Sequence, residues 1–149
     1  MNRDQILRIP TLRNLKQAVA KTAILTAGLM MLGISMPANA ASTYASVSTG
    51  FCLDSNAEGK VYAIGCNGGH YQLWESQGKR LVDLATGKCL DSNAEGKVYA
   101  IPCNGGNYQN WERQGKRLVN AQTGRCLDGN AASEVYTLGC NGGNYQSWN

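Results

Sequence analysis

Apolar residues in the second part of the chain occur in short runs that alternate with turn-forming residues. The run Val-Tyr-Ala-Ile at 61–64 is rich in β-branched and aromatic side chains, and it lies between Ser-Asn at 55–56 and Asn-Gly-Gly at 67–69. Such runs bounded by Gly, Asn and Ser are typical of β-strands joined by tight turns. No window shows a sustained helical period, so the pattern predicts an all-β fold whose many short strands close on one another and leave few edges exposed.

The strand pattern occurs three times along the chain. The tripeptide Cys-Leu-Asp returns at a step of 37 residues, at 52–54, 89–91 and 126–128. Residues 52–82 differ from residues 89–119 at four of 31 positions, and the third copy has diverged further. The sequence therefore contains an internal repeat.

The strand that precedes each Cys-Leu-Asp belongs to the same repeat. The boundaries then give three units, which we call unit 1 (43–79), unit 2 (80–116) and unit 3 (117–149). Open stacks of repeats need atypical end repeats, whereas these three units are alike. We therefore expect a single domain at 41–149 with a closed three-fold arrangement.

The first forty residues differ in composition from the repeats. A basic stretch leads into an apolar run of twelve residues at 23–34, and Ala38-Asn39-Ala40 has the small residues of a cleavage site. This order predicts a secretory signal peptide at 1–40 that is cleaved after Ala40. An uncleaved membrane anchor is the alternative, but a bilayer span needs about 20 apolar residues.

The net positive charge of the whole chain comes from the expected signal peptide. The chain has 14 Lys and Arg and 10 Asp and Glu, and residues 1–40 hold five of the former and one of the latter, so nine of each remain. A net charge of zero argues against nucleic acid or an anionic membrane as a partner. We expect the mature protein to be a secreted or periplasmic monomer without a membrane span.

All six cysteines lie in the repeats, at two per unit. An even cysteine count in a small exported domain predicts disulfides. Six cysteines allow 15 pairings, and the repeat symmetry favours the one within each unit: Cys52 with Cys66, Cys89 with Cys103, and Cys126 with Cys140. A zinc site would need further ligands, and the chain has one histidine, His70, so we expect no metal and no cofactor.

Each unit also carries a Gln-x-Trp triplet, and the two outer side chains share one face of a strand. A tryptophan could stack on a ligand, but a chain this poor in large apolar residues needs all three in its interior, with the Gln amides bonded to buried backbone groups. We therefore assign to the core Gln72, Trp74, Gln109, Trp111, Gln146 and Trp148.

The order Cys-Leu-Asp, Val-Tyr, Cys-Asn-Gly-Gly and Gln-x-Trp resembles the ricin-B-type β-trefoil lectins over the whole of 41–149. The resemblance implies a β-trefoil that binds carbohydrate and is not an enzyme. The runs 102–109 and 120–128 resemble most closely a three-repeat member that binds high-mannose glycans, so glycans of that type, on glycoproteins or polysaccharides, are the expected partner.

Each unit supplies a set of side chains suited to a neutral sugar. A carboxylate accepts hydrogen bonds from two hydroxyls, an Asn amide donates and accepts, and a Tyr ring covers the apolar face of the sugar. The resemblance implies one shallow site per unit: Asp54, Tyr62, Ile64, Asn67 and Tyr71; Asp91, Tyr99, Ile101, Asn104 and Tyr108; Asp128, Tyr136, Leu138, Asn141 and Tyr145. The alternative is that Asp and Asn only close turns.

Other functions have weaker support. The three equivalent aspartates cannot divide the roles of acid and base, and no nucleophile-base set stands out, so we expect no catalysis. A module that works beside a separate glycoside hydrolase and a protein-binding trefoil are the alternatives. Unit 3 has Gly129 for Ser and Ser133 for Gly, and it is expected to bind more weakly than the others.

Overall fold

The computed structural model describes residues 40–149, and the expected signal peptide lies outside them except for Ala40. The described residues form ten strands and three 3-10 helices: β1 (Cys52–Ser55), β2 (Val61–Ile64), η1 (His70–Gln72), β3 (Trp74–Gln77), β4 (Arg80–Asp83), β5 (Cys89–Ser92), β6 (Val98–Ile101), η2 (Asn107–Gln109), β7 (Trp111–Gln114), β8 (Arg117–Asn120), β9 (Cys126–Gly129), β10 (Val135–Leu138) and η3 (Asn144–Gln146). No helix among them is long and apolar enough to cross a membrane.

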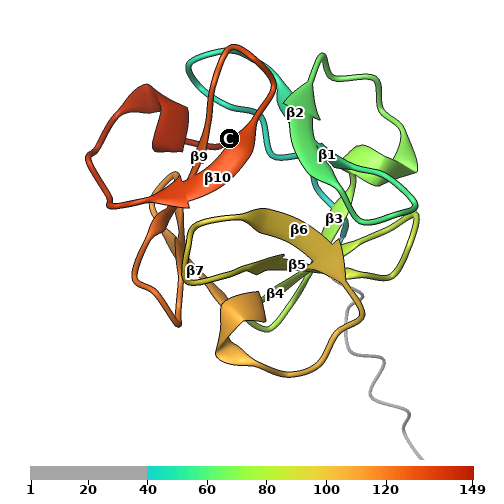
Figure 1. The fold of residues 1–149 in the computed structure, drawn as a ribbon. Coiled ribbons are helices and arrows are strands. Elements are labelled where there is room, and N and C mark those ends of the chain that lie inside the picture. Colours follow the sequence, from blue (N-terminus) through green and yellow to red (C-terminus); the bar gives the residue numbers. More distant parts are fainter. Residues whose placement is uncertain (1–39) are drawn as a thin grey trace, which may run out of the picture. The chain divides into compact units, whose positions relative to one another are not determined.

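The strands repeat one antiparallel plan. Each unit contributes a hairpin that starts at its Cys-Leu-Asp, namely β1–β2, β5–β6 and β9–β10. The pairs β3–β4 and β7–β8 join successive units into the sheets β3-β4-β5-β6 and β7-β8-β9-β10. Figure 1 shows β2, β6 and β10 arranged around a common centre, which is the pseudo-three-fold axis.

The two ends of the domain pair with each other. Ser46 forms a β-bridge with Trp148, and the backbone N–H groups of Ala45 and Asn149 donate to each other's carbonyl oxygens at 3.1 and 2.8 Å. This pairing closes the ring of strands between units 1 and 3. The predicted all-β, three-fold trefoil is thereby confirmed.

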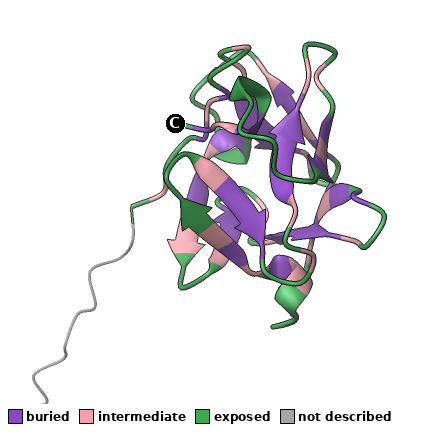
Figure 2. Cartoon of the chain, turned by 90° about the vertical axis from the view of Figure 1, so that its left-hand side faces the viewer, coloured by how far each residue is buried: buried purple, intermediate pink, exposed green. Residues whose placement is uncertain are grey.

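The core lies where the three units meet. Leu53, Leu90 and Leu127 have no exposed surface, and the Trp side chains of the three Gln-x-Trp triplets are buried beside them. Each indole N–H donates to the carbonyl oxygen of the Leu in its own unit, at 2.9–3.1 Å. In Figure 2 most buried residues lie in the strands and most exposed residues lie in the loops. The interior placement assigned to the tryptophans from the sequence agrees with these positions.

The disulfides join the two ends of each hairpin. The pairs are Cys52–Cys66, Cys89–Cys103 and Cys126–Cys140, with Cα atoms 5.0–5.1 Å apart. The predicted pairing within units is therefore confirmed. Because the second cysteine of each pair lies at the start of the loop that follows the hairpin, the bridge fixes the start of that loop beside the Cys-Leu-Asp strand.

Candidate functional site

Strand register places an aspartate opposite a tyrosine in every hairpin. Asp54 pairs with Tyr62, Asp91 with Tyr99, and Asp128 with Tyr136. Directly opposite residues in an antiparallel pair have their side chains on the same face, with Cβ atoms about 4.5–5.5 Å apart. The three aspartates are nearly buried, at 3–4% exposure, and the tyrosines are half-buried. Each pair therefore forms part of a polar surface, with the buried Asp at its base and the Tyr at one side.

The apolar wall of each surface follows from the same register. Ile64 lies two residues after Tyr62, so it shares the face of that ring, as Ile101 does in unit 2. The two isoleucines are half-buried, whereas Leu138 of unit 3 is 48% exposed. The sequence-predicted wall residues thus lie beside the Asp–Tyr pairs, with less cover in unit 3.

The Asn-Gly-Gly loop turns back toward the aspartate. The Asn67 Oδ1 accepts the backbone N–H of Gly69 at 2.7 Å, and the same bond is 2.8 Å long in units 2 and 3. Gly68 has φ of +71°, which favours glycine, and a Cβ on Gly69 would lie 2.9 Å from Asn67 Oδ1. The turn explains why Asn-Gly-Gly occurs in every unit. The Nδ2 of the Asn side chain remains available to donate a hydrogen bond to a ligand.

The buried glutamines hold this loop in place. Gln72 is fully buried; its Oε1 accepts the Asn67 backbone N–H at 2.8 Å and its Nε2 donates to the Gly65 carbonyl at 3.1 Å. Units 2 and 3 repeat both bonds. In unit 2 Gln109 also hydrogen bonds with the Asp91 carboxylate. The glutamine therefore links the loop to the aspartate, a positioning role that the sequence did not reveal.

The second tyrosine of each unit is accessible to solvent. Tyr71 and Tyr145 are 39% and 43% exposed, and Tyr108 is half-buried. Each of these rings lies near enough to the first tyrosine of its unit to act on it electrostatically. All five predicted side-chain types therefore gather at one shallow surface per unit.

Burial and charge act on the titratable groups of these surfaces. Burial raises the pKa of Asp91, and hydrogen bonds from Gln109 and Tyr99 partly oppose this rise. Burial also raises the pKa of Tyr62, Tyr99 and Tyr136, and the neighbouring aspartate charge adds to the effect. The three phenols therefore keep their protons at neutral pH and serve as donors.

The hydroxyl contacts differ between the units. The Tyr62 hydroxyl interacts with the Asp54 carboxylate and also lies 3.2 Å from the carbonyl oxygen of Ser55. Tyr99 donates to Asp91, whereas the oxygen of Tyr136 accepts from the Asn130 amide. Unit 3 therefore lacks the Tyr–Asp hydrogen bond of the other two.

Two substitutions distinguish the turn of unit 3 from those of units 1 and 2. Ser133 stands where units 1 and 2 have glycine, and it keeps a left-handed φ of 68°. Gly129 stands where they have serine, and a Cβ there would lie 3.3 Å from the Trp148 ring. Asn130 then bonds to the backbone of Ala132 as well as to Glu134. The turn of unit 3 keeps the backbone hydrogen bonds of the other two units, and the difference lies in the added contacts of the Asn130 side chain.

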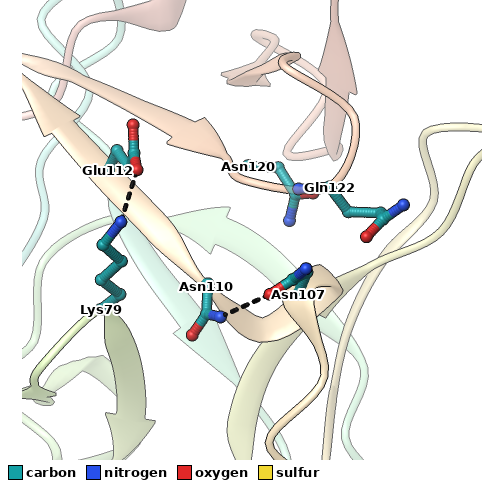
Figure 3. A network of polar contacts seen from close by, with 6 residues as sticks. All are labelled: Lys79, Asn107, Asn110, Glu112, Asn120 and Gln122. Carbon is teal, nitrogen blue, oxygen red and sulfur yellow. Dashed lines mark hydrogen bonds and ion pairs between the residues drawn. The ribbon is translucent and has the colours of Figure 1, made fainter.

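A polar network supports the second surface (Figure 3). The Nδ2 of buried Asn120 donates to the Tyr108 carbonyl at 2.7 Å, and its Oδ1 accepts the Gln122 backbone N–H at 3.1 Å. Asn110 donates to Asn107 at 3.1 Å, next to Tyr108 in the chain. These bonds fix the backbone of Tyr108 more firmly than that of Tyr71, which is followed by Leu73 in place of Asn110.

The closed trefoil and its three repeated polar surfaces define the class of β-trefoil lectins, whose fold implies carbohydrate binding. The chain belongs to the family of ricin-type beta-trefoil lectin domains, whose model matches residues 41–148. Domains of this family are generally non-enzymatic. No curated protein shows significant sequence similarity to the chain.

Solved structures show the same fold. The designed three-fold symmetric protein ThreeFoil is 26% identical, with 71% of this chain and 94% of that one covered and a TM-score of 0.63. The β-trefoil lectin of the Vibrio vulnificus hemolysin/cytolysin, solved with N-acetyl-D-lactosamine, is 24% identical over 74% and 92%, with a TM-score of 0.67. The exo-β-1,3-galactanase 1,3Gal43A of Clostridium thermocellum is 18% identical over 75% of this chain and 30% of its own length, with a TM-score of 0.64.

Proposed function

We propose that the protein is a secreted lectin with three shallow sugar sites, one in each unit. The observation that carries the proposal is that one arrangement occurs three times. It consists of a buried Asp opposite a Tyr, an Asn held by its loop, and a second Tyr that is exposed in units 1 and 3 and half-buried in unit 2. A purely structural turn needs neither the exposed ring nor the free amide nitrogen. The disulfide-bonded domain also fits an oxidising compartment.

Each side chain has a distinct part in holding a sugar. In unit 2 the Asp91 carboxylate accepts hydrogen bonds from two neighbouring hydroxyls, and the Asn104 Nδ2 donates to a third oxygen. The Tyr108 ring stacks on the apolar face of the pyranose, and Ile101 covers its edge. Gln109 holds Asp91 in position without touching the ligand.

The proposed ligands are high-mannose glycans. The runs 102–109 and 120–128 resemble actinohivin, and the Asp, Tyr, Ile or Leu, Asn and Tyr positions of each unit match its mannose-contacting residues. Galactose-type sugars are the competing specificity, because the Vibrio vulnificus lectin was solved with N-acetyl-D-lactosamine. Both sugars use the same donors and acceptors in different directions, so binding data must decide between them.

Three weak sites favour branched or clustered targets. A shallow site that binds a single sugar near the millimolar level contributes about −4 kcal/mol. Three sites on one rigid body raise the apparent affinity by roughly 10²–10⁴ when the glycan branches reach more than one of them. The three-fold arrangement in Figure 1 presents the sites in different directions, which suits a branched glycan or a dense surface.

A glycan array with the disulfide-bonded protein tests the proposal. We expect binding to high-mannose structures that mannose and α-linked mannobiose compete away. The variant Asp54→Asn, Asp91→Asn and Asp128→Asn keeps the side-chain shape and should lose binding. Leu84→Ala is the matched control, because Leu84 is 47% exposed and lies outside the three sites. Undiminished binding by the triple variant would show that the aspartates only close turns.

A carbohydrate-binding module that works beside a separate hydrolase is the second candidate function. It is favoured by the match to the exo-β-1,3-galactanase, in which the similar part makes up 30% of a longer chain. This function uses the same three sites, and its ligand would be a polysaccharide. Retention of the protein on an insoluble polysaccharide, and loss of that retention in the triple Asn variant, would identify it.

A further inference from the structure

A cavity lies on the pseudo-three-fold axis, apart from the floors of the three sugar sites. Its volume is about 810 Å³, and Val61, Val98 and Val135 line it, one from each unit. These three side chains are buried, and each belongs to one of the strands β2, β6 and β10 that surround the centre in Figure 1. The cavity is therefore built jointly by the three units.

Charged side chains from the three units border this cavity. Residues alternate in direction along a strand, so Lys60, Lys97 and Glu134 point away from the core where the valines after them point inward. All three are exposed, and all three line the cavity. Within residues 40–149 neither lysine has an ion-pair partner, and the Glu134 carboxylate is instead held by the Asn130 amide at 2.6 Å. Two unpaired cations therefore face the cavity.

Each charged residue also lies beside a sugar site of the next unit. Lys60 forms a β-bridge with Tyr99, Lys97 with Tyr136, and Glu134 with Tyr62. Opposite residues of a bridge have neighbouring side chains on one face. The sites of units 2 and 3 therefore each have a lysine at the edge that faces the axis, whereas the site of unit 1 has a carboxylate there.

Other acidic residues act on two of these tyrosines without lining the cavity. Glu58 acts electrostatically on Tyr62, and Glu95 acts on Tyr99. Neither of them lines the cavity. Glu134 differs from them, because it lines the cavity and also acts electrostatically on Tyr136 of its own unit. Two lysines and one carboxylate therefore border the cavity, and their net positive charge favours a negative group on a bound glycan that points toward the axis.

We propose that the axial cavity is a subsite for an anionic substituent, such as a carboxylate, sulfate or phosphate, on a glycan whose neutral sugar occupies the site of unit 2 or unit 3. The proposal rests on the proposed lectin function and adds a preference to it. Tyr62 and Tyr136 line the cavity and also belong to the sites of units 1 and 3, so a glycan in either site can reach into it. The site of unit 2 adjoins the cavity through Lys60, which lines it and forms a β-bridge with Tyr99. Lys60 and Lys97 would supply the selectivity, and Glu134 would reduce it at unit 1, where it bridges Tyr62, and in part at unit 3, where it acts on Tyr136.

Paired probes test this subsite on the full protein. We would measure dissociation constants by calorimetry for mannose and mannose 6-phosphate, and for N-acetyllactosamine and its 6-sulfated and sialylated forms. Exposed charge pairs imply that an acidic probe binds about two- to thirtyfold more tightly than its neutral partner at low salt. This ratio should approach one at about 1 M NaCl, where the screening length falls to about 3 Å.

Substitutions at the charged residues around the axis test whether they cause the preference for acidic probes. The double variant Lys60→Gln and Lys97→Gln should bring the ratio of acidic to neutral affinity near one, and Glu134→Lys should raise it. Lys116→Gln is the control, because Lys116 is exposed and lies outside the cavity lining. Urea midpoints would verify folding of each variant.

The outcomes separate the two proposals. Neutral probes that bind while their acidic partners bind no more tightly would overturn the axial subsite and leave the lectin function standing. Binding of neither member of any pair would overturn the lectin function itself. Equal competition by inorganic sulfate or phosphate without any sugar would show a free-anion site rather than a glycan subsite, and would also overturn the proposal as stated.

Discussion

One pair of serines at equivalent positions should respond in opposite ways to the same substitution. The hydroxyl of Ser55 in unit 1 donates to the Oδ2 of Asp83 in unit 2 at 2.7 Å, and both groups are buried. At the equivalent position for Ser92 of unit 2, Asn120 of unit 3 replaces the aspartate and directs its Nδ2 to the Tyr108 carbonyl at 2.7 Å. The buried Ser92 hydroxyl then has no hydrogen-bond partner among the described residues.

The magnitudes follow from what each substitution leaves behind. Ser55→Ala leaves a buried carboxyl oxygen of Asp83 without its donor, which costs about 1–3 kcal/mol of unfolding free energy. The other oxygen, Oδ1, still accepts from the backbone and hydroxyl of Thr86. Ser92→Ala removes an unpaired buried hydroxyl and is expected to be neutral or to stabilise by up to about 1 kcal/mol.

Urea unfolding with the disulfides intact measures this difference. Ser55→Ala should lower the midpoint at constant m-value, and Ser92→Ala should not. A third variant, Ser55→Ala with Asp83→Asn, copies Asn120 of unit 3 and should recover part of the loss. Equal shifts for the two serine variants would refute the reasoning, because the two sites differ mainly in the Asp83–Asn120 exchange.

Three further outcomes are expected. Ser133→Gly should stabilise the protein by about 1 kcal/mol in urea unfolding, because Ser133 has a left-handed φ of 68° that costs an L-residue energy; an unchanged or lower midpoint would contradict this. In a protein where only unit 2 keeps its aspartate, sugar binding should fall on acidification with a midpoint above 3.8, because burial raises the pKa of Asp91 and its protonated carboxyl is a poorer acceptor. The same raised pKa means that Asp91 favours folding most at low pH, and this contribution is lost as the pH rises through its folded-state pKa. Asp91→Asn should therefore not destabilise the protein at neutral pH. Calorimetry across pH 3–8 checks the fall in sugar binding, and thermal unfolding over the same range checks the pH dependence of stability. Replacing Cys89 and Cys103 by Ala should cost about 3 kcal/mol, since their separation of 14 residues closes a short loop, and a midpoint unchanged from that of the native protein would show that the reduced chain retains the same constraint.

Much of the fold could be predicted because the same sequence pattern occurs in each of the three units. The strand runs, the spacing of the cysteines and the Gln-x-Trp triplets are local patterns, and their recurrence at a step of 37 residues reduced the disulfide choices to the pairing found. The association of Asp54 with Tyr62 is also local, because both lie in one hairpin. Their role in binding a sugar stays a prediction.

Differences between the units were harder to interpret. Asp83 and Asn120 occupy equivalent positions, and each lies 28 residues after a serine. The sequence does not show that this difference decides whether the serine hydroxyl has a hydrogen-bond partner. The sequence also predicted that Gln109 lies in the core, but it did not predict the hydrogen bond from Gln109 to Asp91. Such effects depend on which side chains the closed ring of strands brings within hydrogen-bond distance.

The sequence by itself determined the short strands, the three-fold repeat and the residues that each unit contributes. Only the tertiary structure decided what meets between units. Closure of the ring places Lys60, Lys97 and Glu134 around one axis, and it places the Arg113 guanidinium over the Tyr44 ring at 5.5 Å. The physical reason is that strand and turn preferences act over a few residues, whereas these contacts depend on the twist and closure of the whole barrel.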